Sequence, residues 1–490
     1  MSLSVSLGVA QSGLSVTADQ TAVVSRNIAN QGVPGASRKN ANVVTAPGGG
    51  IRLASITRVT NDALFRNVLV TTASSSTQDA VVEALDRLDQ TVNDPELDAS
   101  PAAKLTAFDS ALRQYADSPS TPAMARNAVA AANDLAVALN SASQTVQQVR
   151  QQADDDMAAS VDKLNSLLSQ FESLNLAIVK GTRSGTDVTD QLDARDNVLT
   201  SIAEQIGVRV VSRADNDMAL YTDSGVTLFD VKPRAVTFDP TNNLSAGITG
   251  NAVLIDGVPV TGSGGMPASS GRLVGLAAVR DDVAVTYQSQ LDEIARGLIE
   301  AFAESDQSAV PTLPDAPGLF TWSGGPAMPP GSGTVVDGLA SSIHISPLVD
   351  PAQGGNPDLV RDGGIAGVPD YVYNPSGASG FSDRLHSLVD KLAQTRSFDP
   401  VAQAGTSMSL ANFASSSVAW LEQVRSTATS EKEYRTTLLD RSTEALSKIA
   451  GVNLDEEMTN LLDLERSYQA SSKLVSTIDQ MFQALLSAVG

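Results

Sequence analysis

The chain has 490 residues, a formal net charge of −22 and a pI near 4.4. So strong a negative charge repels the phosphate backbone of nucleic acids, and the absence of cysteine excludes disulfides and thiolate metal sites. Hydrophobic residues make up 42% of the chain but aromatic residues only 4%. The cores must therefore be aliphatic, which suits long helices better than aromatic-lined pockets.

The charge is unevenly distributed between the two ends of the chain. The first sixty residues hold five basic side chains and one acidic side chain, whereas residues 451–490 hold six acidic and two basic side chains. Opposite charge favours contact between the two ends.

The N-terminal segment carries a mostly apolar stripe whose members step alternately by four and three positions. This is the spacing of a heptad seam on a helix, about 37 Å long. Its members are Leu3, Leu7, Ala10, Leu14, Thr17, Thr21, Val24 and Ile28. The turn residues of 30–35 end the predicted helix, and short strands with a turn at 47–50 are expected up to residue 61.

A helical pattern is predicted for residues 62–180, with breaks near Asp94-Pro95 and at 118–122. The stretch 123–180 is longer than a typical globular helix and indicates a rod or a long hairpin arm. A further helix is predicted at 187–206, and Gly207 closes it.

Alternating residues and turn residues in 211–270 predict a small antiparallel β domain. A helix is expected again at 271–303. The segment 305–381 is rich in proline and glycine and has little periodicity, so we expect an insertion that decorates the surface. From residue 382 to the end the pattern is helical.

The C-terminal segment carries a second heptad seam, about 42 Å long. Its members are Leu461, Leu464, Tyr468, Ser471, Val475, Ile478, Phe482, Leu485 and Val489. One such stripe is usually an ordinary core face. Two matched seams at the chain ends predict a two-stranded coil, which has little core of its own and would gain burial from neighbouring copies. The residues expected at this assembly interface are Leu3, Leu7, Leu14, Val24, Ile28, Asn30, Leu461, Leu464, Tyr468, Val475, Ile478, Phe482 and Leu485.

The predicted fold is mainly α with an inserted β domain. A terminal coiled-coil domain (1–61 and 451–490) is followed by a rod-like helical arm, an outer β domain (211–270) and a Pro/Gly-rich insertion (305–381). The arm is expected to consist of residues 62–210, 271–304 and 382–450.

Residues that could carry chemistry are scarce. The two histidines, His344 and His386, are not paired by their spacing, and no nucleophile, phosphate-loop or metalloprotease motif is present. The acidic segment 94–98 resembles a calcium loop weakly, but Ala99 and Leu105 stand where glycine and glutamate are needed. We therefore expect no enzyme activity, cofactor or metal. No secretory signal or transmembrane segment is expected either.

Several segments resemble signatures of the flagellar rod, hook and hook-associated proteins. At the N-terminus these are Ser12-Gly13-Leu14, Asn27-Ile28-Ala29-Asn30 and Pro34-Gly35-Ala36-Ser37-Arg38; at the C-terminus they are residues 451–458 and 464–471. The interior segments 192–199 and 271–276 resemble the members that join hook to filament. Ala36 is a departure, since the family usually has an aromatic residue after the Pro-Gly pair.

The resemblance implies an extracellular structural subunit of the bacterial flagellum that forms a ring of its own copies between hook and filament. It implies as partners the hook protein, the next junction protein and an export chaperone, and export through the flagellar type III channel without signal cleavage. It also implies a radial order in which the terminal helices are innermost and the β domain outermost. The alternatives are another axial subunit (hook or rod), or an adhesin or enzyme with coiled-coil ends and a site in 305–381.

Overall fold

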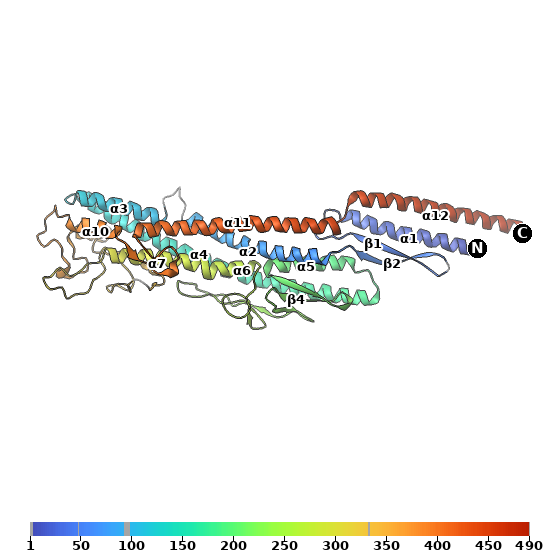
Figure 1. Cartoon of the computed structure of the whole chain (residues 1–490), viewed down its shortest axis with the longest axis horizontal. Helices are drawn as coiled ribbons and strands as arrows, with labels where there is room; N and C mark the ends of the chain where they lie inside the picture. Colours follow the sequence, from blue (N-terminus) through green and yellow to red (C-terminus); the bar gives the residue numbers. More distant parts are fainter. Residues whose placement is uncertain (1–2, 48, 93–98, 332–333, 490) are drawn as a thin grey trace.

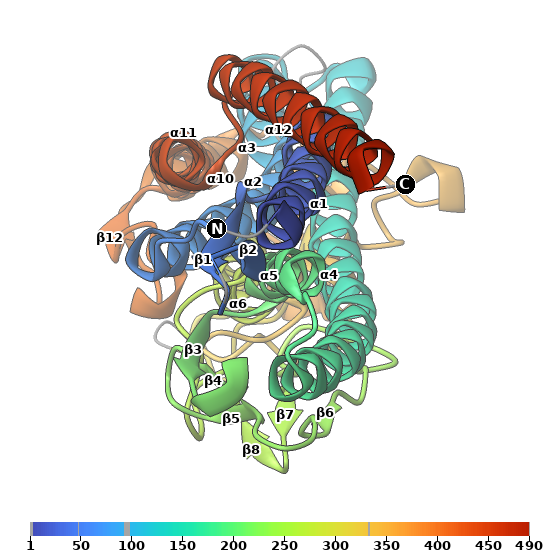
Figure 2. The ribbon, with the colours of Figure 1, turned by 90° about the vertical axis from the view of Figure 1, so that its right-hand side faces the viewer.

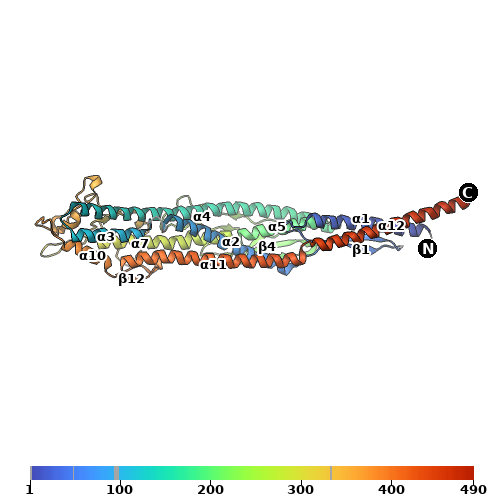
Figure 3. The ribbon, with the colours of Figure 1, turned by 90° about the horizontal axis from the view of Figure 1, so that it is seen from above.

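The computed structural model describes residues 3–47, 49–92, 99–331 and 334–489. Gly48 of the expected turn and the acidic segment 94–98 lie outside the described residues, as does the side chain of Val489. The molecule is a long rod with both termini at the same end (Figures 1 and 3). None of its described helices is long and apolar enough to cross a membrane.

Helices form most of the rod, as the sequence predicts. They are α1 (Leu3–Ala29), α2 (Asp62–Val92), α3 (Pro101–Asp117), α4 (Pro122–Ser184), α5 (Thr189–Gln205), α6 (Arg272–Ala278), α7 (Ala284–Ala301), α8 (Leu339–Ser342), α9 (Leu359–Asp362), α10 (Asp383–Ala393), α11 (Leu410–Ala450) and α12 (Leu454–Val489). A π-helical turn, η2 (Val279–Val283), joins α6 to α7, and short 3₁₀ turns occur at Ala214–Asn216, Pro351–Gln353, Pro369–Tyr371 and Pro400–Ala402.

The strands are short and form small antiparallel sheets. They are β1 (Lys39–Thr45), β2 (Ile51–Arg58), β3 (Val208–Ser212), β4 (Met218–Thr222), β5 (Thr227–Phe229), β6 (Val236–Thr237), β7 (Leu254–Ile255), β8 (Val258–Pro259), β9 (Phe320–Thr321), β10 (His344–Ile345), β11 (Arg396–Ser397) and β12 (Ser407–Met408). β1 and β2 form a hairpin, and two three-stranded sheets have the orders β3-β4-β5 and β6-β7-β8. In the end view these two sheets lie on the side of the rod opposite α12 (Figure 2).

The axis of the arm is α4, which has 63 residues and is about 95 Å long. Pro122 stands in its first turn, where a missing N–H costs nothing. It ends at Gly185, whose φ of 71° is the left-handed conformation that glycine adopts without strain. The backbone N–H of Thr186 reaches back 2.9 Å to the carbonyl of Gly181, so the last turn is satisfied.

Two apolar clusters lie along α4, one on each half. The first half, up to Val149, packs with α3, α7, α10 and α11, and the second half, from Ala153, packs with α5, α6 and the sheets. Between them lie the buried side chains of Arg150 and Asp154. The Arg150 Nε donates to the Arg280 carbonyl at 2.8 Å, and Arg280 pairs with Asp154. A polar layer thus separates the two clusters.

The expectation that residues 305–381 decorate the surface is wrong for much of this segment. Phe320 is fully buried, and its ring lies 5.5 Å from that of Phe108 and 5.3 Å from that of Phe302. The segment is also tied to α7 by Asp292, whose carboxylate accepts the backbone N–H of Ala340 at 2.8 Å. The sequence lacks periodicity here because single apolar side chains, rather than the face of one element, enter the core.

Candidate functional site: the terminal helices and their junction with the arm

The two terminal helices pack along each other at one end of the rod (Figures 1 and 3). A Cβ at Gly13 of α1 would lie 3.4 Å from the Ser471 hydroxyl of α12, so the helices are in close contact there. Most of the residues predicted at the assembly interface are shielded from solvent in this protomer. Val24 and Ile478 are buried, and the half-buried residues are Leu3, Leu7, Leu14, Ile28, Asn30, Leu461, Leu464, Val475 and Phe482.

Two predicted seam residues are about half exposed in this protomer. Tyr468 is 49% exposed and Leu485 is 53% exposed. Other large apolar side chains of α12 are exposed as well: Leu474 (57%), Met481 (53%) and Leu486 (70%). Leu474, Met481 and Leu485 are spaced by seven and four residues, so they share one face of the helix. We call Leu474, Met481 and Leu485 the outward stripe.

A second face of α1, which the sequence analysis missed, packs on the β1–β2 hairpin. The Ser12 hydroxyl accepts the backbone N–H of Ile51 at 3.1 Å. Asn27 exchanges two hydrogen bonds with the backbone of Lys39, at 2.9 and 3.0 Å. Val16 and Val23 are buried between these two anchors. Val16 and Val23 are seven residues apart, which is a helical spacing, but the sequence analysis assigned the apolar face of this helix to the heptad seam alone.

The segment after α1 is fastened to α5 of the arm. The Ser37 hydroxyl donates to Asp193 at 2.6 Å, and its backbone N–H donates to the same carboxylate at 3.2 Å. Gly35 has a φ of 74°, and a Cβ there would lie 1.7 Å from the side-chain oxygen of Asn197. The Pro-Gly turn therefore needs glycine for its backbone and for its close approach to α5. Ala36, between them, is half-buried.

Four aspartates at or just before α5, spaced by three residues, pair with cations of the N-terminal segment. The guanidinium of Arg26 lies 3.1 Å from Asp187 and 3.4 Å from Asp190. The ammonium group of Lys39 pairs with Asp190 and lies 3.6 Å from Asp193. The guanidinium of Arg58 lies 3.1 Å from Asp193 and 2.6 Å from Asp196. We call these seven residues the junction ladder. It joins the terminal domain to the arm over the first two turns of α5.

The middle of the junction ladder is shielded from solvent. The Lys39 side chain is 1% exposed, and the side chains of Arg58 and Asp193 are 14% and 10% exposed. Burial on its own would lower the pKa of Arg58, but the adjacent Asp196 and Asp193 raise it instead. The two carboxylates therefore outweigh the effect of burial on the Arg58 guanidinium.

The C-terminal side of the junction involves Arg38. Its backbone N–H donates to the carbonyl of Ala450, the last residue of α11, at 2.7 Å. Its guanidinium lies 2.5 Å from Glu456 in the first turn of α12. Arg38 thus spans the break between α11 and α12. The N-terminal signature, the α5 segment and the C-terminal signature, far apart in sequence, meet at this junction.

The residues with conventional chemistry are not part of this site. His344 and His386 are exposed, and the Nδ1 of each lies 2.9 Å from a nearby backbone carbonyl, of Ser342 and Ser382 respectively. Within the described part of the chain, no three metal-ligating side chains come together.

Comparisons with known proteins find flagellar relatives of this chain. The family model for the flagellar hook-associated protein FlgK helical domain matches residues 85–318, and that for the flagellar basal body rod FlgEFG protein C-terminal matches residues 446–488. The chain is 20% identical over 481 residues to flagellar hook-associated protein 1 of Bacillus subtilis (strain 168), covering 93% of this chain and 89% of that protein. It also resembles the flagellar hook junction protein FlgK from Burkholderia pseudomallei, with a TM-score of 0.42 and 22% identity over 52% of this chain and 46% of the other. The chain is thus a relative of flagellar hook-associated protein 1, with a match to the FlgK helical domain at residues 85–318.

Proposed function

We propose that this protein is a structural subunit of the bacterial flagellum that joins the hook to the filament. Its relative in Bacillus subtilis, matched over nearly the whole of both chains, is a flagellar hook-associated protein 1. The helical-domain match over residues 85–318 favours this role over that of a hook or rod subunit. The observation that supports the proposal most directly is that α12 of the terminal domain packs on α1 on one side and exposes apolar side chains on another.

The first side of α12 packs on α1, and its second side carries the outward stripe, with more than half of each of the three side chains exposed. Burying such apolar surface releases about 25 cal/mol per Å². Neighbouring copies of the chain are the proposed source of that burial, and they would form a ring. The buried and half-buried residues of the expected interface would hold each protomer's helical pair together. The outward stripe, which includes Leu485 of the expected interface, would contact the next protomer.

The remaining partners follow from this position in the flagellum. One end of the ring would contact the hook protein and the other end the next junction protein. Export would be through the flagellar type III channel, assisted by a chaperone. The proposed role is mechanical, without catalysis or a cofactor.

A deletion strain of the source bacterium tests this function. We expect hooks without filaments in electron micrographs, and filament subunits released into the medium. A hook or rod subunit would give a different result, because its deletion would remove the hook itself. Normal filaments in the deletion strain would refute a role in flagellar assembly altogether.

A further inference from the structure

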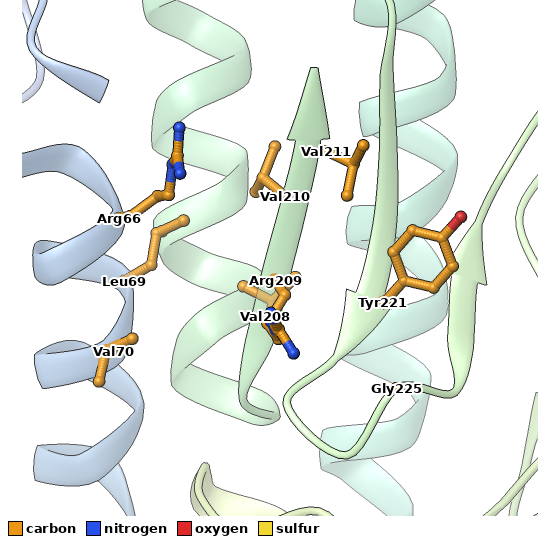
Figure 4. A pocket seen from close by; sticks show the side chains of 9 residues that line it. All are labelled: Arg66, Leu69, Val70, Val208, Arg209, Val210, Val211, Tyr221 and Gly225. Atoms are coloured by element: carbon orange, nitrogen blue, oxygen red, sulfur yellow. The ribbon is translucent and has the colours of Figure 1, made fainter. Parts of the chain in front are cut away.

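One cavity, of about 300 Å³, lies where α2 packs on β3, and Figure 4 shows Leu69 and Val208 among the aliphatic side chains that line it. Another cavity, of about 380 Å³, lies where α2, α4, α5 and α6 meet. Every side chain that lines this second cavity is polar, except that of Ala159. We call the second cavity, at Ser160 and Gln205, the polar groove. Its volume falls within the range of about 300–1,000 Å³ that is typical of small-molecule sites.

The backbone around the polar groove is held by contacts between the end of α5, the start of α6 and the middle of α2. The N–H of Gly271 donates to the carbonyl of Ala73 at 3.1 Å and to the hydroxyl of Thr77 at 2.8 Å, both in α2. A Cβ at Gly271 would lie 2.4 Å from the Cα of Ile206, directly after α5. The groove is therefore lined by side chains from a framework of closely packed helices.

Two polar side chains of the polar groove are buried without a hydrogen-bond partner. Ser160 of α4 is 5% exposed, and Gln205, the last residue of α5, is 3% exposed. Among the residues that the structure describes, neither side chain forms a hydrogen bond, and nor does that of Ser76 on α2. A buried polar group without a partner is unfavourable, so these hydroxyl and amide groups are available to a ligand in the groove.

The charged side chains of the polar groove already have partners of opposite charge. Measured from nitrogen to carboxylate oxygen, the pairs are Lys163–Glu204 at 3.4 Å, Arg272–Asp156 at 3.3 Å and Lys432–Asp79 at 2.9 Å. Because the charges are paired, the groove does not neutralise a charged ligand. A paired carboxylate can still accept further hydrogen bonds, and a paired guanidinium or ammonium group can still donate them. The ligand that fits this lining is therefore polar but neutral.

We propose that the polar groove binds a neutral carbohydrate, either a free sugar or one unit of a glycan chain. A sugar hydroxyl both donates and accepts hydrogen bonds, so neighbouring hydroxyls can bond to Ser160, Gln205 and the paired charges in turn. A charged ligand would place a like charge against one member of each ion pair, and an apolar ligand would leave the buried polar groups without partners. The groove belongs to the arm and is separate from the terminal helices, so it does not depend on the proposed function.

The experiment uses the purified full-length chain with D-glucose and maltotriose as probes. Saturation-transfer difference NMR measures the Kd of each sugar for the wild type and for the Ser160→Ala/Gln205→Met double variant. The double variant should bind at least about tenfold more weakly, which corresponds to about 1.4 kcal/mol. Because neither side chain forms a hydrogen bond in the fold, the double variant should unfold at or above the wild-type temperature. The matched control, Ser110→Ala/Gln114→Met, changes two exposed residues of α3 outside the groove, and it should bind within about twofold of the wild type.

Charged probes of similar size test the chemistry on the wild type alone. D-glucuronate and D-glucosamine should each bind more weakly than D-glucose, because each brings a charge that the paired side chains do not neutralise. Tighter binding of maltotriose than of D-glucose would support a glycan chain as the ligand, and equal binding would support a free sugar. The proposal would be overturned if the wild type bound neither neutral sugar, if a charged probe bound more tightly, or if the double variant and the control bound equally well.

Discussion

The Ser37 hydroxyl donates a 2.6 Å hydrogen bond to Asp193, across 156 positions of sequence. The same carboxylate lies 3.1 Å from Arg58 and 3.6 Å from Lys39. Asp193 is therefore the point at which the turn after α1, the first strand of the hairpin and the end of the second are all held against α5. Removing it leaves the buried ammonium group of Lys39 with Asp190 alone.

Asp193→Ala should destabilise the attachment of the terminal domain by about 2–4 kcal/mol, because it leaves buried donors and cations without their partner. Urea denaturation gives the free energy of unfolding, and amide exchange of α1 and the hairpin should quicken relative to α4. Glu444→Ala is the control, since it removes only the exposed partner of Lys448 at 2.7 Å on helix α11 and should cost less than about 1 kcal/mol. Equal costs for the two variants would show that the junction ladder contributes no more than a surface ion pair.

Gly35→Ala and Gly32→Ala form a matched pair at the Pro-Gly turn. Both glycines have a positive φ, 74° and 76°, so both variants incur about 1–2 kcal/mol of backbone strain. A Cβ meets nothing within 4 Å at Gly32, but it meets Asn197 at Gly35. Gly35→Ala should therefore be the less stable variant in thermal unfolding. Adding Asn197→Ala should erase the difference, and a difference that persists would place its cause elsewhere than in this contact.

Leu474→Asp should block assembly while leaving the monomer intact. The side chain is 57% exposed, so the substitution should change the free energy of unfolding by no more than about 0.5 kcal/mol. Val475, one position along, is half-buried, so Val475→Asp should in addition speed amide exchange in both terminal helices. Complementation of the deletion strain, read by motility in soft agar and by electron microscopy, measures assembly.

Lys473→Ser is the control for these two variants, because it changes an exposed polar neighbour without touching either apolar face. Wild-type filaments in the strain that carries Leu474→Asp would exclude the outward stripe as an interface.

Asp292 should give the arm a pH-dependent stability. Burial raises the pKa of Asp292 to about 7, although hydrogen bonds from Ala340, Gly338 and Gln288 act in the opposite direction. The folded protein therefore holds a proton that the unfolded chain releases near pH 4, so the contribution of this group to stability falls as the pH rises from about 4 to about 7.

The measured quantity is the difference in free energy of unfolding between Asp292→Asn and the wild type, followed from pH 4 to pH 8. The amide does not titrate, so the difference should shift in favour of the variant by up to about 1.4 kcal/mol per pH unit. Asp315→Asn, which changes an exposed aspartate of the segment 305–381, should show no such slope. A difference that does not change with pH would mean that Asp292 is ionised throughout.

The helices could be predicted from the sequence because their periodicity is long and their ends carry strong signals. The stretch 123–180 became α4, bounded by Pro122 and Gly185 as helix chemistry requires. The terminal seams were also visible, since a heptad spacing repeats over several turns. Periodicity does not say which neighbour an apolar residue faces, however. Tyr468 continues the seam in sequence and yet is 49% exposed.

The junction could not be predicted, because its residues are spread over the chain and follow no periodicity that links them. Each aspartate from 187 to 196 reads in isolation as a solvated acid in an acidic protein, and Arg58 as a cation at the end of a strand. The resemblance to flagellar proteins identified the segments 34–38, 192–199 and 451–458, but it did not predict that they are in contact. Only the folded chain brings Ser37 to Asp193 and Arg38 to Glu456.

The length of α4 has a mechanical consequence. One unbroken column of backbone hydrogen bonds runs from the side of the junction to the far end of the rod, through both apolar clusters. A bending load applied at the terminal helices is therefore carried by α4 alone, and no loop between the two apolar clusters has to transmit it. The long helices are interrupted at Gly451–Asn453, between α11 and α12, and in the turn after α1. The arm is thus continuous along α4, and the breaks between the long helices lie at the junction.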